Sequence, residues 1–400
     1  MRVSRPCRMF GAQQALGGME GGVLLLHSTV GCHYASLGFH FISTDMAEVR
    51  QTCTVIGEDD IVMGGTRSLK KSLETIKEQY DPSVVFLLQG CVSDIIQDDI
   101  HSECRDLSRS SGIRVLPVEC SGFGGSEQDG YEAALTLLIE LMEDHDHADN
   151  DRKKIGVNLL GFGQDTPGAE ADIRELKYLL APDVEIVCVP GISNYDRLKY
   201  AGGADLNIVL GRGKKLAIEM ERKFGIPWVS VDHPFGLVGI RKIWDLLHSR
   251  FSLSFEQQEL RFIHDSEKRL RRVYSYLQSL YGVPCAVIGT EARCAGLASF
   301  LSNELGMEIE FCGCREEYDS AEKIEDALFK HEIGMIFGSS FETEFAEKLG
   351  IPLVRCEYPI FDRRHLREHP YIGVEGTVSI LEDMINEVHI ARHLNGELFL

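Results

Sequence analysis

Several features that would assign the chain to a common functional class are missing from its 400 residues. No uninterrupted apolar run of about 18 residues occurs, so we expect no membrane span. The N-terminal segment lacks the apolar core of a secretory signal, which favours a cytoplasmic protein. Basic residues are too few for a nucleic-acid partner: 41 Lys and Arg stand against 62 Asp and Glu, and the formal net charge is −21.

Two short motifs are also missing. No C-x-x-C pair occurs among the 12 cysteines, so we expect neither a zinc ribbon nor a zinc finger. The phosphate-binding loop G-x-x-x-x-G-K-[ST] does not occur either, so the chain is not expected to hydrolyse ATP itself.

Short apolar runs alternate with amphipathic helical stretches along the whole chain. Runs such as VVFLLQ (84–89), KIGVNLLG (154–161) and PCAVIG (284–289) are almost continuously apolar, and each is followed by a helical pattern. This is typical of parallel strands covered on both faces. The sequence therefore predicts an α/β fold of three doubly wound, Rossmann-like parallel-sheet domains.

Polar segments suggest where these domains meet. Residues 142–154 are charged and lack apolar periodicity, which is typical of a linker. Residues 254–281 form a charge-rich amphipathic pattern that predicts one long connector helix. We therefore predict a first domain at 1–148, a second at 153–253, and the connector helix with a third domain at 254–400.

Three cysteines follow predicted strands. Cys32, Cys91 and Cys120 lie at or just after the ends of apolar runs, and Cys7 lies in an N-terminal segment that could fold over the same edge. Helix N-termini at such places favour thiolates, which an iron–sulfur cluster needs. The long separations match no local metal motif, so from the residues alone buried structural thiols are the favoured interpretation and a cluster is the minority alternative.

An ordered set of segments resembles the nitrogenase component 1-type oxidoreductases, a family that includes nitrogenase subunits and nitrogenase-like relatives. The resemblance covers nearly the whole chain, and its clearest segments are CRMFGAQQALGGMEGGVLLLHSTVGC (7–32), IGEDDIVMGGTRSLKKSL (56–73), QGCVSDIIQDDI (89–100) and VLPVECSGFGG (115–125). In the third segment Gln97 stands where the family usually has Gly.

The resemblance implies a cofactor and partners. Cys7, Cys32 and Cys91 match the family's three ligands of an interface iron–sulfur cluster, either 4Fe–4S or a larger P-cluster-like one. A homodimer, or a heterodimer with a similar subunit, would complete that cluster. An ATP-dependent iron-protein reductase would deliver electrons to a substrate or cofactor in a central cavity between the domains.

Two departures from the family pattern limit the function. The cysteine that holds the large catalytic cofactor is replaced by Gly211, and its histidine partner aligns at about Arg363, with His365 two residues on. A dinitrogen-reducing subunit is therefore not predicted. Four alternatives stay open: a reductase of tetrapyrroles, a reductase of small sulfur compounds, a scaffold for cofactor assembly, and a non-catalytic partner subunit.

Four further residues are candidates for a pocket. Cys120 lies at the predicted cluster edge, although a structural thiol is the commoner case there, and the family resemblance puts Cys53 close to positions near the substrate side. His365 and Arg363 belong to an arginine-rich loop that would suit an anionic substrate, and a solvated surface loop is an equal alternative.

Overall fold

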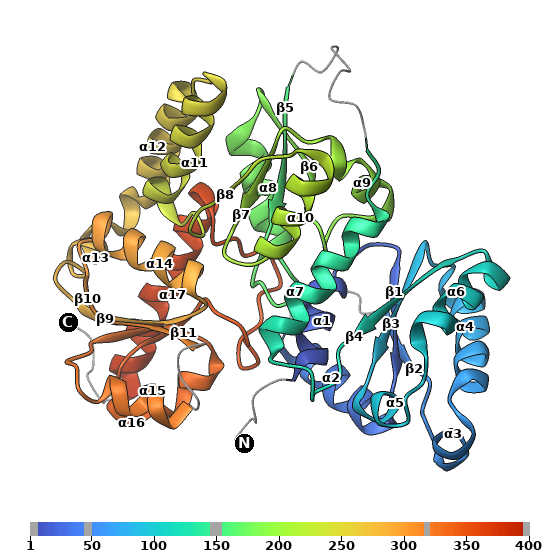
Figure 1. The fold of residues 1–400 in the computed structure, drawn as a ribbon. Coiled ribbons are helices and arrows are strands. Elements are labelled where there is room, and N and C mark those ends of the chain that lie inside the picture. The colour runs from blue at the N-terminus through green and yellow to red at the C-terminus, as the bar shows by residue number, and fades with distance from the viewer. Residues whose placement is uncertain (1–6, 44–49, 145–153, 316–320, 395–400) are drawn as a thin grey trace. The chain divides into compact units, whose positions relative to one another are not determined.

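The computed structural model describes residues 7–43, 50–144, 154–315 and 321–394. Their strands form three four-stranded parallel sheets with flanking helices, which confirms the predicted α/β class (Figure 1). In each sheet the strands stand in the same order, namely second, first, third and fourth along the chain. The first and third strands of every sheet are therefore central neighbours.

The first sheet carries the predicted cluster residues. Its strands are β1 (Gly22–His27), β2 (Gln51–Cys53), β3 (Val84–Gln89) and β4 (Arg114–Glu119). Its helical segments are α1 (Arg8–Leu16), α2 (Val30–Ser43), α3 (Glu58–Met63), α4 (Thr66–Tyr80), α5 (Cys91–Ile95), α6 (Ile100–Ser111), α7 (Glu127–Leu137) and η1 (Leu138–Leu141).

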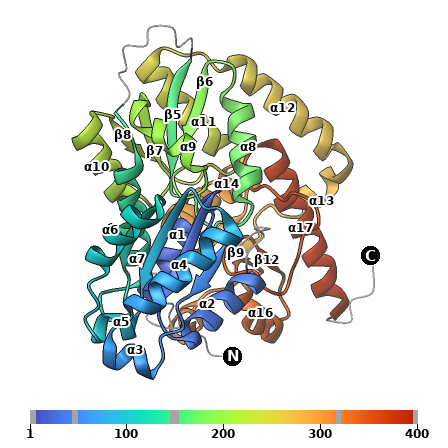
Figure 2. The ribbon, with the colours of Figure 1, turned by 90° about the vertical axis from the view of Figure 1, so that its right-hand side faces the viewer.

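Both faces of the first sheet are buried, which explains its continuous apolar runs. Side chains alternate along a strand, so Val23 and Leu25 pack in one cluster with residues of α4 and α6. Leu24 and Leu26 pack in another with residues of α1 and α7 (Figures 1 and 2). Burial on both sides fixes the register of β1 and hence the place where its carboxyl end meets the surface.

The second and third sheets repeat this arrangement. The second comprises β5 (Ile155–Leu160), β6 (Val184–Cys188), β7 (Leu206–Val209) and β8 (Trp228–Ser230), with α8 (Ala169–Leu180), α9 (Tyr195–Lys199), η2 (Tyr200–Gly203), α10 (Lys214–Phe224) and α11 (Gly236–Phe251). The third comprises β9 (Pro284–Gly289), β10 (Glu308–Cys314), β11 (Met335–Gly338) and β12 (Leu353–Arg355), with α14 (Glu291–Asn303), α15 (Ala321–Leu328), η5 (Ser340–Glu342), α16 (Thr343–Leu349) and α17 (Gly373–Leu394).

Contacts between residues divide the chain into two compact units. The first takes the described residues within Met1–Ile42, Met46–Asp165 and Ile186–Val229, and the second takes those within Ser43–Asp45, Thr166–Glu185 and Ser230–Leu400. One sheet comes from each predicted domain segment, but α8 groups with the second unit. The boundaries near 148 and 253 stay predictions, and most of the predicted linker lies outside the described residues.

The predicted single connector helix is interrupted. Helix α12 (Glu256–Leu270) ends in a 3-10 turn, η3 (Arg271–Val273), before the short α13 (Tyr274–Gln278). Lys268 lies three and four residues before Arg271 and Arg272, and like charges at these spacings repel on a helix. The amphipathic pattern alone did not predict this break.

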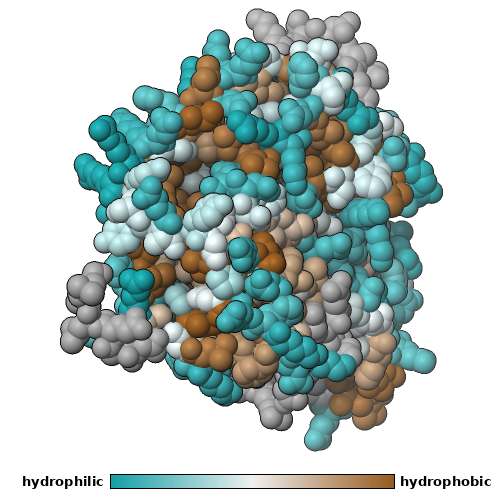
Figure 3. Space-filling view, turned by 90° about the vertical axis from the view of Figure 1, so that its left-hand side faces the viewer, coloured by the Kyte–Doolittle hydropathy of each residue, from teal (hydrophilic) through white to brown (hydrophobic). Residues whose placement is uncertain are grey.

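None of the described helices is a candidate for a membrane span. Within the described ranges, every helix is too short or too polar for that role. Figure 3 shows one face of the molecule, on which hydrophobic residues form separate patches between hydrophilic ones.

Candidate functional site

The carboxyl ends of β1 and β3 form the centre of the candidate site. After β1 the chain continues to β2 on one side of the sheet, and after β3 it continues to β4 on the other side. The point between β1 and β3 is therefore a switch point, and open α/β sheets bind ligands at such points. The two ends are tied together, because the Gly90 amide donates to the His27 carbonyl at 3.1 Å. Cys32 lies in the first turn of α2 and Cys91 begins α5.

Cys7 reaches the same edge because α1 packs unusually close to α7. It is the N-cap of α1 and pairs with Ser126 in an isolated antiparallel bridge. A Cβ atom on Gly11 would lie 1.8 Å from a carbonyl oxygen of α7, and one on Gly130 would lie 1.8 Å from the Arg8 carbonyl oxygen. Only glycine permits this helix contact, so the two glycines set the position of Cys7.

Gly122 lies between two of the three predicted ligands. Its amide donates a hydrogen bond of 3.2 Å to Sγ of Cys91. A Cβ atom built on it would lie 3.6 Å from Cys7 Cβ. Cys7, Cys32 and Cys91 are all partly exposed, and each lies at the start of a helix, where backbone amides without a helical partner could face a bound group.

The two cysteines predicted as pocket residues differ in burial. Cys53 ends β2 with its Sγ 3.3 Å from the Ser28 carbonyl oxygen, and burial together with the nearby Cys32 thiol raises its pKa. Cys120 is wholly buried and donates to the Gln89 carbonyl at 3.5 Å. Burial, and then the charges of Cys7 and Cys91, raise the pKa of Cys120, so its thiol stays protonated.

The spread of the three predicted ligands argues against a single ion. Among the described residues, their sulfur atoms do not gather within 4.8 Å of one another. A cluster holds thiolates farther apart than one ion does, because each thiolate binds a different iron atom.

Two buried hydroxyl groups lie in the same strand ends. Ser28 and Ser93 are completely buried, and their Oγ atoms have no hydrogen-bond partner within the described part of the chain. The Ser28 hydroxyl lies against Gly90, where an added Cβ would come within 2.3 Å of it. Buried polar groups normally have partners, but both side chains are closed off from the surface, so neither hydroxyl faces a group bound at this edge.

His27 is explained by structure rather than chemistry. Its ring is fully buried, with Nδ1 3.0 Å from Thr54 Oγ1 and Nε2 2.8 Å from Asp98 Oδ2. Burial lowers its pKa despite the Asp98 carboxylate. The neighbouring Asp99 caps α6 by accepting from the Ser102 amide at 3.0 Å.

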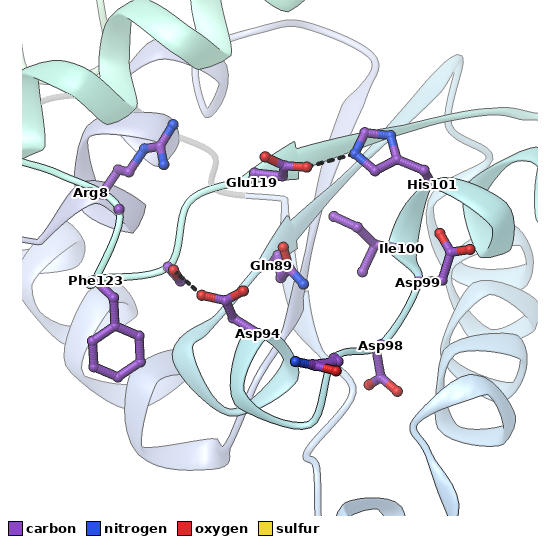
Figure 4. Close-up of a pocket in the computed structure, with 12 residues that line it drawn as sticks. Arg8, Gln89, Asp94, Asp98, Asp99, Ile100, His101, Glu119 and Phe123 are labelled. Atoms are coloured by element: carbon purple, nitrogen blue, oxygen red, sulfur yellow. Dashed lines mark hydrogen bonds and ion pairs between the residues drawn. The ribbon is translucent and has the colours of Figure 1, made fainter.

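A polar pocket of 530 Å³ opens beside this edge (Figure 4). It contains four carboxylates against one arginine and one histidine, and several of these groups pair with one another. His101 lies 2.8 Å from Glu119, and Ser121 donates to Asp94 at 2.6 Å. Because several of these charged groups already pair with one another, the lining does not indicate which kind of ligand the pocket would bind. The charged lining residues are Arg8, Asp94, Asp98, Asp99, His101 and Glu119.

The other two pocket candidates, Arg363 and His365, belong to the second compact unit, whereas Cys7, Cys32 and Cys91 belong to the first. Arg363 pairs with Glu387 at 2.7 Å. The His365 ring stacks on His369, with centroids 3.6 Å apart and planes 9° apart. Asp383 lies 2.9 Å from His369, a neighbour that sequence reasoning missed because it belongs to α17, far along the chain.

Comparisons with known proteins agree with the fold and the order of the motifs. A family model for "Nitrogenase component 1 type Oxidoreductase" matches residues 7–389. The nitrogenase iron-molybdenum cofactor biosynthesis protein NifE of Clostridium pasteurianum is 28% identical over 95% of this chain and 86% of its own length. The nitrogenase molybdenum-iron protein beta chain of Methanococcus maripaludis is 23% identical over 96% and 93%.

A solved structure shares the fold. Nitrogenase Cp1 at pH 6.5 superposes with a TM-score of 0.82 and 18% sequence identity, covering 100% of this chain and 95% of that one. The family match extends over almost the entire described chain and includes Cys7, Cys32 and Cys91. The chain is therefore a member of the nitrogenase component 1-type oxidoreductase family.

Proposed function

We propose that the chain is an oxidoreductase subunit that binds an iron–sulfur cluster through Cys7, Cys32 and Cys91. The carrying observation is that these partly exposed thiols begin three helices at one sheet edge, with sulfur atoms spread too widely for one ion. A 4Fe–4S or larger P-cluster-like cluster is the group that this arrangement suits. When bound, it supplies one-electron transfer.

A second subunit completes the site in this proposal. Iron–sulfur clusters generally take more than three protein ligands, so a second chain would supply the rest. Large apolar side chains exposed beside the cysteine segments support a protein contact here. A homodimer or a heterodimer with a similar chain would cover them. They are Val30, Tyr34, Val55, Ile95 and Phe123, whose exposed fractions run from 45% to 71%.

Hydrogen-bond donors beside the thiols fit a cluster. The Gly122 amide already donates to Cys91 Sγ, and the first-turn amides of α2 and α5, which have no partner within their own helices, lie beside Cys32 and Cys91. Donors to cluster sulfur atoms stabilise the reduced state and thereby tune the reduction potential. The chain's own part is to hold the thiolates, to supply these donors and to exclude water.

Electrons would come from an ATP-dependent iron-protein reductase. This role follows from the family resemblance and from the missing phosphate-binding loop. The sequence does not favour dinitrogen, because Gly211 replaces the cofactor cysteine.

A scaffold for cofactor assembly is the second candidate. The relative with 28% identity is named as a cofactor biosynthesis protein. Gly211, just after β7, has a φ of +85°, a conformation in which a side chain is strained. A site without a thiolate at this position would hold a cofactor loosely and could hand it on.

Iron content tests the cluster. We would purify the protein without oxygen, alone and with a homologous partner chain, and measure iron and acid-labile sulfide. About two irons per chain indicate one four-iron cluster shared by a homodimer, and about four indicate a larger shared cluster or one each. The triple variant Cys7→Ser, Cys32→Ser, Cys91→Ser should lose this iron, whereas Cys312→Ser, at an exposed thiol, should retain it. Unchanged iron in the triple variant would refute the proposal.

Two assays then separate enzyme from scaffold. Reduction of a small substrate in the presence of a cognate reductase and ATP supports the enzyme. Transfer of a cluster or cofactor to an apo-acceptor, without turnover, supports the scaffold.

A further inference from the structure

Two histidines and an aspartate gather in the second compact unit. The ligand atoms of His365, His369 and Asp383 all lie within 4.8 Å of one another. His369 Nε2 lies 2.9 Å from Asp383 Oδ2, and the two imidazole rings stack with centroids 3.6 Å apart. Within the described residues, this is the one group of three such side chains that comes this close.

The fold holds two of these side chains firmly. His369 lies in the segment between β12 and α17, just before Tyr371, which is 1% exposed. The Tyr371 amide donates to Asp172 at 2.6 Å and its hydroxyl donates to the Arg355 carbonyl at 3.2 Å. Asp383 lies on α17 next to the buried Met384. His369 and Asp383 are therefore each held in place by neighbouring residues that are packed in the core.

Two arginines of this region pair with carboxylates other than Asp383. Arg363 pairs with Glu387 at 2.7 Å. Arg355 pairs with the same Glu387 at 3.3 Å and with Asp362 at 2.7 Å. Since these arginines have other carboxylates, Asp383 can give its charge to a cation beside His369.

We propose that His365, His369 and Asp383 bind one divalent transition-metal ion of the zinc class, with an open fourth position. Two ligands about 2.0–2.1 Å from one tetrahedral zinc ion are about 3.3 Å apart, and the three ligand atoms already lie within 4.8 Å of one another, so binding would need only that the two histidine rings rotate out of their parallel stack. Two imidazole nitrogens and one carboxylate oxygen form a ligand set that Zn²⁺ accepts, and it lacks the thiolates that an iron–sulfur cluster needs. The ion would tie the segment before α17 to that helix.

This site is independent of the proposed cluster. Its ligands come from the second unit and include no cysteine, whereas Cys7, Cys32 and Cys91 lie in the first. Loss of iron in the triple cysteine variant and loss of metal at the His–Asp site are therefore separate results.

Cobalt titration tests the site. The full chain, treated with chelator, is titrated with Co²⁺ alone and followed by visible absorption. We expect one equivalent to give d–d bands without the intense near-ultraviolet bands of cobalt–thiolate bonds. His369→Ala and Asp383→Asn should each weaken binding at least about tenfold, and His365→Ala should weaken it in the same direction. Zn²⁺ should raise the thermal midpoint of the wild type but not that of His369→Ala.

Two controls keep the result specific. His101→Ala removes a histidine that lies 2.8 Å from Glu119 without a second histidine, and it should leave cobalt binding unchanged. The double variant Cys312→Ser, Cys314→Ser removes thiols of β10 and should also leave it unchanged. No saturable binding, binding that persists in both His369→Ala and Asp383→Asn, or a thiolate spectrum abolished by the cysteine variant would each overturn the proposal.

Discussion

The backbone amide of Gly122 donates a hydrogen bond to Sγ of Cys91, and the two atoms are 3.2 Å apart. A Cβ atom at residue 122 would come 3.3 Å from the same sulfur. Gly122→Ala should therefore crowd Cys91 where it binds the proposed cluster. We expect less iron per chain after anaerobic reconstitution and a nearly unchanged urea midpoint.

Gly57→Ala is the matched control for this substitution, because a Cβ atom there meets no other atom within 4 Å. It should leave the iron content at the wild-type value. Equal iron in Gly122→Ala and the wild type would show that residue 122 does not border the cluster.

The close packing of α1 on α7 predicts a large stability effect. Gly130→Ala places a methyl group 1.8 Å from the Arg8 carbonyl oxygen, so α1 has to shift. Overpacking of this kind costs about 1–3 kcal/mol, which a lowered urea midpoint would report. Gly38→Ala on α2, where a Cβ atom meets nothing within 4 Å, should keep or slightly raise the midpoint. A Gly130→Ala protein as stable as the wild type would contradict the packing described.

A buried histidine makes the second unit sensitive to acid. His233 Nε2 lies 3.0 Å from Arg293 Nη1, which donates to it, and burial and this charge lower the pKa of His233 to about 4. The unfolded chain takes up this proton near pH 6.5, so stability falls as the pH decreases from 6.5 toward 4. The slope is at most about 1.4 kcal/mol per pH unit.

Thermal midpoints of the wild type and His233→Gln test this dependence. The variant should be less stable at pH 7, because it loses the contact with Arg293. The difference should shrink as the pH falls toward 4.5. A difference that stays constant over this range would mean that His233 does not contribute to the acid sensitivity.

A carboxyl group on α8 gives the opposite dependence. Burial, and then the charge of Glu375, raise the pKa of Glu175 to about 7. The folded chain keeps the proton that the unfolded chain loses near pH 4.5, so stability falls as the pH rises from 4.5 to 7. Glu175→Gln should therefore raise the free energy of unfolding at pH 8 by on the order of 1 kcal/mol after solvent screening, and change it little at pH 4.5. A higher thermal midpoint at pH 8 alone would report this gain. Glu170→Gln, at an exposed position of the same helix, should show no such contrast.

Much of the fold could be predicted because its signals are local. The run VVFLLQ is buried at every position of β3, and a strand covered on both faces needs this continuous apolar pattern. The positions of Cys32 and Cys91 after β1 and β3 follow from the same pattern. The break at Arg271 in the connector helix was missed, because the amphipathic period continues through it.

The sequence did not predict which residues far apart along the chain lie close together in the fold. Cys53 was a pocket candidate through the family resemblance alone, and its closeness to Cys32 depends on β2 pairing with β1, which the sequence did not predict. The approach of Asp383 to His369 depends on how α17 returns past the preceding segment. Gln97 adopts a φ of +59°, which accounts for the glycine that the family usually has there. Its neighbouring sequence gives no sign of this strain.

The strand order that recurs in all three sheets has an evolutionary consequence. Each sheet offers its own pair of central strand ends, and in the second and third sheets those after β7 and β11 carry Gly211 and Ser339 rather than cysteine. A few residues in short turns thus decide which of three equivalent positions can hold thiolates. Chemistry could be gained, moved or lost by point substitutions in those turns, while the scaffold beneath them stays the same.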